Sequence, residues 1–435
     1  MYIQLPVGSL FLFRVVLVSG IVFLLWKKKI SLDFSYYTKN MSYILLFWLG
    51  FGLLGLIWTP DLKAGLMEIA NLTKGVAIFM LISSLLKQFD RPVKLLRFSW
   101  LISLGLVLFI AWYEFYYNKH LQSHFSDLLM TLDHYNVSHK NLISVFSGPN
   151  ELSVFLSLSI PFLLLSFKKQ QFIAVVLILI SVYLIWLNDS KIVVISSVFQ
   201  LLSLLLVYRS VLSERLYAFF TNKVNVAVTG VVVVLFIGLL GTGTFYSYPT
   251  KTGTDVGMMD SFSDDFNAVM NKQNQGKWTD GHFSRTLSSR DIRKALIQNG
   301  LVFWKDSYFF GAGAGSFMHK MSHYECWYDA DNFVNPHSWW IEILSQYGVI
   351  VFLLYFGWMG AIFIMLVRKL TTVKNSTDYY KEILAFCFTF FLAYLLCTNS
   401  SSSFMALPIN WVGLAIVAFF ADRMKGIIPE TQNEG

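Results

Sequence analysis

Long stretches of uncharged, apolar residues separated by short polar segments dominate the chain. A helix needs roughly 20 predominantly apolar residues to cross a bilayer. The runs therefore predict membrane-spanning helices at residues 7–26, 42–58, 64–86, 98–116, 149–167, 172–188, 191–208, 225–247, 336–366, 383–398 and 404–421. The ninth run is longer than a bilayer requires, so we expect part of it to tilt or to extend beyond the membrane. No basic segment precedes the first run, which therefore reads as a retained span and not as a cleaved signal peptide.

This pattern predicts an all-α fold: a polytopic transmembrane helix bundle of about 11 spans with one large extracytoplasmic loop between spans 8 and 9. Residues 1–247 would form spans 1–8 and residues 248–335 the loop, while residues 336–435 would form spans 9–11 and a tail. Composition agrees, because only 14% of the 435 residues are charged and 55% are hydrophobic. Soluble domains usually carry about 25% charged residues, so this chain lacks the polar side chains to cover such domains.

Lysine and arginine are distributed unevenly among the short loops. Most lie in alternate loops, whereas the loops between them hold only Lys63, Lys119, Lys140 and Lys191. The positive-inside rule then places the basic loops and the C-terminus in the cytoplasm, and the N-terminus and residues 248–335 outside. We read the net charge of +8 as a consequence of this topology, and expect no nucleic-acid partner. The predicted location is the cell (plasma) membrane, crossed several times.

All eight histidines fall on the predicted outer side, so any chemistry is expected there. Their spacings match no zinc pattern, and solvated loop histidines are the simpler interpretation, so we expect no metal site. The three cysteines suggest no pairing either. The sequence therefore predicts neither a metal nor another cofactor.

Ionisable residues inside spans are energetically costly and point to function. Those of this chain are Arg14, Glu68, Lys74, Glu114, Glu151, Lys191 and Glu342. Snorkelling at span ends is an alternative for Glu114 and Glu151, but it explains Arg14 and Lys74 less well. On the predicted layout the set lies in the outer half of the membrane or near its middle, which favours a polar cavity that opens outward.

Three predicted spans enter the membrane from outside through similar polar starts. They begin with Gly148-Pro149-Asn150-Glu151, Asn188-Asp189-Ser190-Lys191 and Asn335-Pro336-His337-Ser338. Each start offers a capping residue, and two have proline at or near the first helical position. The free N–H groups and the positive end of each helix dipole would point outward, an arrangement that binds anions such as phosphate. Lys191 adds a full positive charge to one of these starts.

His337 is the candidate general base. We place it in the first turn of its helix, where the dipole disfavours protonation and a neutral imidazole is expected near neutral pH. A neutral imidazole can accept a proton from a reacting hydroxyl. A purely interfacial histidine beside Trp339 and Trp340 is the structural alternative.

The predicted outer loop contains two notable segments. Residues 288–297 read as a capped amphipathic helix with Arg290, Arg293 and Lys294 on its basic side, although a solvated face or contact with lipid headgroups would give the same pattern. Residues 311–315 alternate glycine and alanine without the strand and helix of a dinucleotide-binding motif. Alternating glycine instead allows the backbone to lie close to a ligand or to another segment.

Four of these segments, in this order, resemble the O-antigen ligase and Wzy-type polysaccharide polymerase superfamily. They are Gly148-Pro149-Asn150-Glu151-Leu152 followed by Pro161; Ser190-Lys191; Arg290 leading to Gly311, Gly313, Gly315 and Phe317; and His337 followed by Glu342 and Gly348. The likeness covers roughly residues 148–351. Lys191 stands where many members have arginine, so a bidentate phosphate contact is lost at that position.

The resemblance implies a membrane glycosyltransferase of the cell envelope that needs no metal and inverts the transferred sugar. It would move a glycan from an undecaprenyl-diphosphate carrier to a hydroxyl of an acceptor glycan or lipid, outside the membrane, in capsule or exopolysaccharide biosynthesis. His337 and Arg290 would be catalytic, and Lys191, Arg293 and Asn150 would bind the diphosphate. The residues do not separate a polysaccharide polymerase from an O-antigen-type ligase.

A transporter or flippase of lipid-linked oligosaccharide is the alternative class. Such proteins also carry charges inside the membrane, but these would be spread through its depth, and internal repeats would be expected. The chain shows no internal repeat, and its intramembrane charges cluster toward the predicted outer side. These features favour the enzyme.

Overall fold

The computed structural model describes residues 2–5, 8–11, 34–89, 91–117, 142–146, 148–165, 171–188, 190–203, 289–323, 325–328, 330, 333–371, 378–400 and 403–426. Its labelled helices are α2 (Tyr36–Gly55), α3 (Leu62–Gln88), α4 (Pro92–Tyr117), α6 (Pro149–Leu165), α7 (Gln171–Leu187), α11 (Ser289–Asp306), α12 (Ser316–Ser322), α13 (Trp339–Thr371), α14 (Asp378–Cys397) and α15 (Pro408–Gly426). A further apolar helix spans Lys191–Ser203.

The predicted helical architecture is confirmed for this part of the chain, with one exception at the N-terminus. Strands β1 (Tyr2–Leu5) and β2 (Gly8–Phe11) form an antiparallel pair in which Leu5 lies opposite Gly8. A helix beginning at residue 7 was therefore the wrong prediction for residues 8–11. Aromatic and β-branched residues such as Tyr2, Ile3 and Phe11 favour strands, and hydropathy alone does not register that preference.

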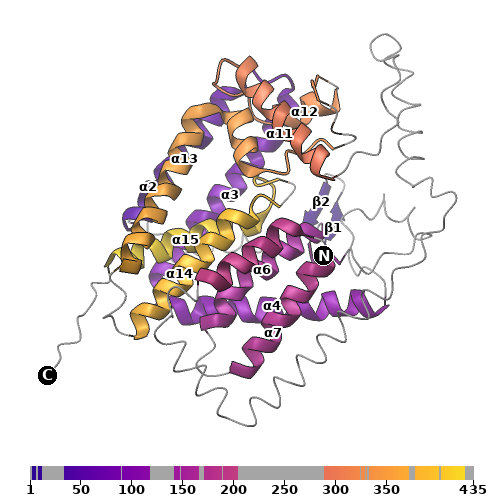
Figure 1. The fold of residues 1–435 in the computed structure, drawn as a ribbon. Coiled ribbons are helices and arrows are strands. Elements are labelled where there is room, and N and C mark those ends of the chain that lie inside the picture. Colours follow the sequence, from indigo (N-terminus) through magenta and orange to yellow (C-terminus); the bar gives the residue numbers. More distant parts are fainter. Residues whose placement is uncertain are drawn as a thin grey trace.

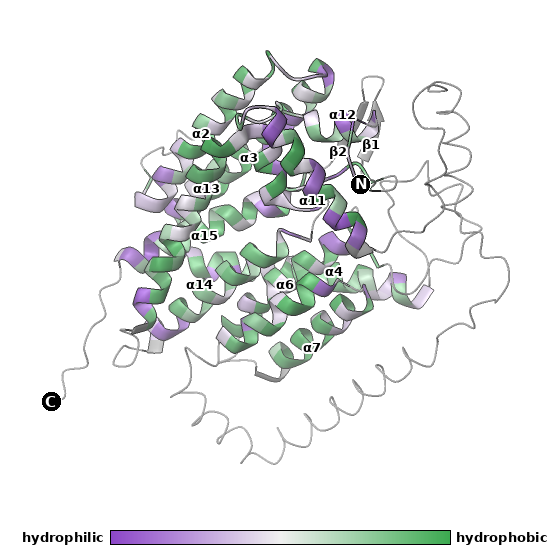
Figure 2. Ribbon diagram, turned by 45° about the horizontal axis from the view of Figure 1, so that its top comes forward, coloured by the Kyte–Doolittle hydropathy of each residue, from purple (hydrophilic) through white to green (hydrophobic). Residues whose placement is uncertain are grey.

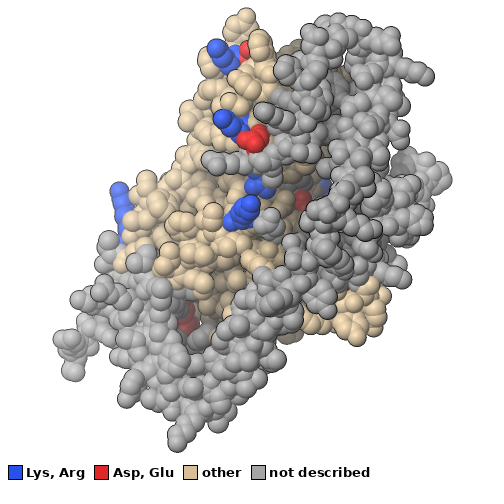
Figure 3. All heavy atoms as spheres, turned by 45° about the vertical axis from the view of Figure 1, so that its right-hand side comes forward, with Lys and Arg blue, Asp and Glu red and all other residues tan. Residues whose placement is uncertain are grey.

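The helices are those of a multi-pass membrane protein. Four are long and apolar enough to cross a bilayer: Leu62–Gln88, Pro92–Tyr117, Trp339–Leu370 and Tyr379–Cys397. Pro149–Leu165, Ile173–Leu187 and Lys191–Ser203 are shorter apolar helices. Figure 2 shows hydrophobic colour over most of α6 and α7 and hydrophilic colour on α11, and charged side chains are sparse on the described surface in Figure 3. The total of about 11 spans stays a prediction, and residues 225–247 lie outside the described ranges.

The helices pack around a core rich in aromatic side chains. The ring of Trp48 on α2 lies 5.4 Å from that of Tyr347, 5.8 Å from that of Tyr355 and 6.3 Å from that of Trp411, measured between centroids. These contacts join α2, α13 and α15, while α3 packs along α15. Helices α11 and α12 lie together at one end of the bundle, against α13 (Figure 1). Aromatic packing thus fixes the helices whose ends form the candidate site.

Helix α13 contains a break that accounts for its length. Gly348 has a φ of 76° and a ψ of −176°, which divides α13 into a short segment before it and a long one after it. The predicted ninth span, residues 336–366, therefore contains two helical segments and is not one uninterrupted helix. A positive φ is readily adopted only by glycine, so the sequence permits the break at this position.

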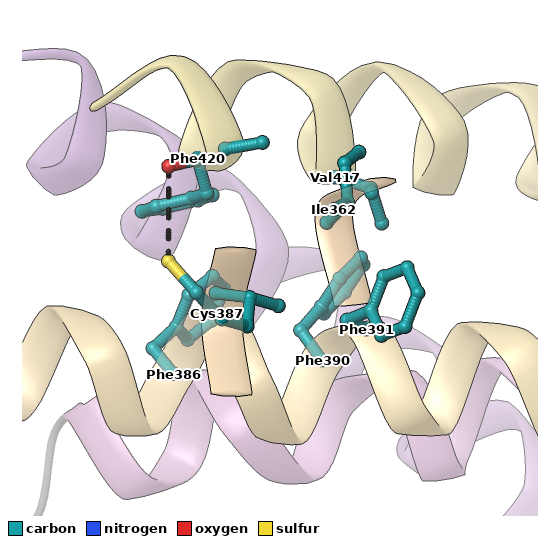
Figure 4. Close-up of a pocket in the computed structure, with 9 residues that line it drawn as sticks. Ile362, Phe386, Cys387, Phe390, Phe391, Val417 and Phe420 are labelled. Atoms are coloured by element: carbon teal, nitrogen blue, oxygen red, sulfur yellow. Dashed lines mark hydrogen bonds between the residues drawn. The ribbon is translucent and has the colours of Figure 1, made fainter. Parts of the chain in front are cut away.

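A small cavity lies between α13, α14 and α15. Figure 4 shows it lined by Phe386, Phe390 and Phe391 of α14 and their apolar neighbours, with the Cys387 thiol donating to the carbonyl oxygen of Phe420 at 3.9 Å. Its volume of about 10 Å³ is at the lower limit for a single water molecule. This part of the core is closely packed and offers no room for a substrate.

Candidate functional site

Two of the predicted helix starts meet through polar side chains. The Asn150 Oδ1 atom accepts hydrogen bonds from the Ser190 hydroxyl at 3.3 Å and the Ser400 hydroxyl at 3.5 Å. The hydroxyls of Ser190 and Ser400 lie 3.0 Å apart. The start of α6, the start of the helix Lys191–Ser203 and the turn between α14 and α15 therefore converge at one point.

Asn188 fixes the position of this convergence. Its side-chain oxygen accepts from the Leu142 N–H at 3.1 Å, and its amide nitrogen donates to the carbonyl oxygens of Leu142 and Pro149, both at 3.1 Å. The side chain is buried, so these bonds are shielded from water. Asn188 was predicted as part of a capped helix start. In the structure it joins the end of α7 to the beginning of α6.

The third helix start is linked to the same turn. The Ser338 hydroxyl, directly before α13, donates to Asn399 Oδ1 at 3.3 Å. The turn between α14 and α15 thus contacts all three predicted helix starts through two neighbouring residues, Asn399 and Ser400. Sequence reasoning missed this turn. A signal was available, because residues 398–403 form an unbroken polar run between two apolar spans.

Side chains from two other helices hold this turn. The carboxyl group of Glu342 on α13 accepts from the Ser403 hydroxyl and from the Phe404 N–H, both at 2.6 Å. The Lys74 ammonium on α3 donates to the carbonyl oxygen of Ala406 at 3.0 Å. Together these three hydrogen bonds restrain the turn from two helices.

Three of the predicted intramembrane charges belong to one polar cluster. Besides its bond to the turn, Lys74 donates to Asn71 Oδ1 at 3.1 Å, and the Asn71 amide donates to Glu68 Oε2 at 3.5 Å. Gln346, one turn beyond Glu342 on α13, accepts the N–H of Gly315 at 2.6 Å. Glu114 and Glu151 are buried elsewhere, at α4 and α6. Arg14 lies outside the described residues, and an outward-opening cavity stays a prediction.

His337 precedes α13 in a left-handed conformation with a φ of 47°. Its ring packs edge-to-face with that of Phe333 at 5.7 Å between centroids. Burial, and then the positive charge of Arg293, lower the pKa of His337 from 6.5 to about 4. The predicted neutral imidazole is supported, but the predicted cause was wrong. Helix α13 begins at Trp339, so His337 is not in its first turn, and desolvation has the largest effect.

The predicted basic residues differ in how directly the structure relates them to His337. Arg293 is half-buried on α11, close enough for its charge to act on His337. Arg290 lies three residues earlier on the same helix. Lys191 is exposed at the first residue of its helix, beside Ser190. The predicted amphipathic helix at residues 288–297 is confirmed as the first part of α11, with Ile292 buried.

The glycine-rich segment packs against another segment of the chain. Ala312 donates its N–H to the carbonyl oxygen of Ser345 at 2.8 Å, and Gly313 donates to that of Gln346 at 3.1 Å. The Thr59 hydroxyl donates to the carbonyl oxygen of Ala314 at 2.9 Å. The close backbone approach that the sequence suggested is thus to the break in α13 and to the turn between α2 and α3. These bonds fasten α11 and α12 to the membrane helices.

Comparison with known proteins bears out the resemblance that the sequence suggested. Residues 154–356 match the family model described as O-antigen ligase, and this range includes Lys191, Arg290, Arg293 and His337. The predicted resemblance is therefore confirmed as a similarity to the O-antigen ligase family over just under half of the chain.

A relative of known role matches nearly the whole chain. It is the teichuronic acid biosynthesis protein TuaE of Bacillus subtilis (strain 168), 25% identical over 425 residues. The match covers 95% of this chain and 79% of TuaE. The similarity therefore extends well beyond residues 154–356, and includes Asn150 and the turn between α14 and α15.

Proposed function

We propose that this protein is a glycosyltransferase that moves a glycan from an undecaprenyl-diphosphate carrier to an acceptor hydroxyl on the outer side of the membrane. The hydroxyl oxygen attacks the anomeric carbon, and the bond from that carbon to the diphosphate oxygen breaks. The hydroxyl proton passes to the His337 imidazole, and the carrier leaves as its diphosphate. A single displacement of this kind inverts the anomeric configuration.

The observation that carries the proposal is a neutral histidine beside an arginine. A pKa of about 4 keeps the His337 ring uncharged and able to accept a proton at neutral pH. The same arginine, Arg293, would attract the donor diphosphate. Once bound, the diphosphate offsets the charge of Arg293, so the pKa of His337 rises and the ring becomes a stronger base when the donor is present.

Departure of the diphosphate requires stabilisation of the negative charge that develops on it. We assign this role to Arg290, Arg293 and Lys191, together with the N–H groups at the starts of α6 and of the helix Lys191–Ser203. Asn150 would orient the donor, because its Oδ1 atom is held by Ser190 and Ser400. With basic side chains in this role, the proposed reaction needs no metal.

The product we propose is a surface polysaccharide. The part of TuaE in teichuronic acid biosynthesis supports this choice, and the O-antigen ligase match supports transfer of a lipid-linked glycan. Polymerase and ligase differ only in the acceptor: a polymerase extends a repeat unit, and a ligase uses a different molecule.

Reconstitution of the purified chain tests the proposal directly. The protein in liposomes is supplied with a lipid-linked oligosaccharide donor and acceptor. We expect a longer or transferred glycan together with released undecaprenyl diphosphate, both identified by mass spectrometry. Movement of intact donor across the bilayer without cleavage of the glycosyl–phosphate bond would identify a flippase and refute the proposal.

The pH dependence of glycan transfer should change when the charge of Arg293 is removed. Only neutral His337 accepts a proton, so kcat/KM falls as the pH drops through the pKa of the free enzyme, about 4. Replacing Arg293 by glutamine removes the positive charge that lowers this pKa. The fall of kcat/KM at low pH should then begin at a higher pH. Its midpoint should stay below the ordinary pKa of histidine, because burial still lowers the pKa of His337. Arg293→Lys keeps the positive charge, so the midpoint should not change. The same dependence of kcat/KM on pH in the wild type and in Arg293→Gln would exclude His337 as the base.

A further inference from the structure

A second, larger cavity lies away from His337, at the ends of α3 and α15. It has a volume of about 250 Å³, far more than the small cavity between α13, α14 and α15. It is lined by the start of α2, the end of α3, the start of α4 and the end of α15, through Phe34, Ser35, Thr38, Ser83, Leu86, Lys87, Phe89, Pro92, Phe419, Asp422 and Arg423. Hereafter we call it the basic cavity.

The charges of the basic cavity favour an anion. Lys87 and Arg423 both line it. The carboxylate of Asp422 is already engaged, because its two oxygens accept the N–H groups of Tyr37 at 2.7 Å and Thr38 at 3.0 Å at the start of α2. The Arg423 guanidinium lies 5.5 Å from the centroid of the Phe419 ring, which holds it at the cavity wall. Among the described lining residues, one carboxylate, which serves as a helix cap, thus accompanies two cations.

A buried hydroxyl in the basic cavity lacks a partner. Ser83 is 5% exposed, and its Oγ atom makes no hydrogen bond to any residue that the structure describes. Ser83 precedes Lys87 by one helical turn, so the two side chains share a face of α3. A buried hydroxyl without a partner costs free energy, which a bound polar group would recover.

We propose that the basic cavity binds the phosphodiester headgroup of an anionic phospholipid such as phosphatidylglycerol. The phosphate lies between Lys87 and Arg423, and a headgroup oxygen accepts the hydrogen bond of Ser83. The acyl chains leave along the apolar wall formed by Leu86, Phe89 and Phe419. Basic pockets between membrane helices on the cytoplasmic side bind such headgroups.

The same features favour a lipid over a soluble phosphate. Phe89 is 46% exposed at the rim, next to the charged wall, so a ligand with both a phosphate and an apolar part matches the cavity best. The predicted topology places Lys87 and Arg423 in cytoplasmic loops, beside the leaflet that carries anionic lipid. The proposal does not depend on the glycosyltransferase reaction, because none of its residues belongs to the proposed active site.

Lipid-dependent stability tests this site. The full-length purified protein is delipidated in detergent, and its thermal unfolding is followed with added phosphatidylglycerol or phosphatidylcholine. We expect phosphatidylglycerol, and not the zwitterionic lipid, to raise the unfolding temperature. The increase should be lost in the double variant Lys87→Gln/Arg423→Gln. It should persist in Arg368→Gln/Lys369→Gln, which removes two charges from the last turn of α13, outside the cavity.

The variant Ser83→Ala distinguishes an effect on lipid binding from an effect on the stability of the lipid-free protein. Without lipid this variant should be as stable as the wild type or slightly more so, because it removes a buried hydroxyl that has no partner. Loss of one hydrogen bond should weaken phosphatidylglycerol binding by roughly three- to tenfold, measured by native mass spectrometry.

Three outcomes would overturn the proposal. One is an equal effect of the two lipids, and another is an undiminished phosphatidylglycerol effect in the Lys87/Arg423 variant. The third is a full effect of soluble glycerophosphoglycerol at the same concentration, which would assign the cavity to a soluble phosphodiester.

Discussion

Replacing His337 by alanine is expected to lower glycan transfer by about 10²- to 10⁴-fold, the usual contribution of a general base. In the proposed reaction the His337 imidazole accepts the proton of the acceptor hydroxyl, and alanine offers no proton acceptor. Because the ring contacts Phe333 at the edge of the packed core, the change should leave the amount of folded protein in the membrane nearly unaltered. A severe loss of surface glycan at normal protein level is therefore the expected result.

The matched control is His323→Ala, which removes an exposed imidazole at the end of α12. Both variants are expressed in a deletion strain, and surface and lipid-linked glycans are separated by length. The pattern left by His337→Ala also identifies the acceptor. Single repeat units on the acceptor would indicate a lost polymerase, and full-length chains stranded on the carrier would indicate a lost ligase. Normal glycan in the His337→Ala strain would remove this residue from the mechanism.

Gly348→Ala is expected to cause the largest loss of stability among single methyl additions in α13. The φ of 76° is unfavourable for alanine, and a Cβ atom there would collide with the backbone carbonyl of Phe310. Strain and overpacking together should reduce the free energy of unfolding by about 2–4 kcal/mol. Activity should fall as well, because the backbone bonds that fasten α11 to the break in α13 would be displaced.

Gly360→Ala provides the control within the same helix. Nothing lies within 4 Å of a Cβ atom at residue 360, and alanine is the better helix former there. Thermal unfolding in detergent should therefore show a clear decrease for Gly348→Ala and no decrease for Gly360→Ala. Equal unfolding temperatures for the two variants would mean that the break in α13 is not required for the folded state.

Most of the helices could be predicted because a membrane span leaves a strong local signal. An apolar run such as residues 172–188 specifies its own helix regardless of what packs against it. The same criterion failed at residues 8–11, where the pairing of β1 with β2 decides the conformation. It also missed the break at Gly348, which is stabilised by backbone bonds to residues more than thirty positions away in sequence.

The sequence could nominate site residues only where single residues carry distinctive chemistry. His337, Arg293, Lys191 and Asn150 were proposed from residue type and from their positions near helix starts. The convergence of the helix starts on the turn between α14 and α15 could not be predicted. Asn399 and Ser400 are small polar residues of ordinary chemistry, and their contacts join residues about 60 to 250 positions apart in the sequence. The low pKa of His337 likewise depends on burial, which local sequence does not report.

The break in α13 also lies where the segments around α11 and α12 join the membrane helices. The short part of α13 before Gly348 is fastened to the glycine-rich segment and packs with α11, which carries Arg293. A donor that displaces α11 should therefore displace Arg293 and the part of α13 before Gly348 together. The distance between His337 and Arg293 would then stay nearly constant while the site adjusts to a bulky glycan.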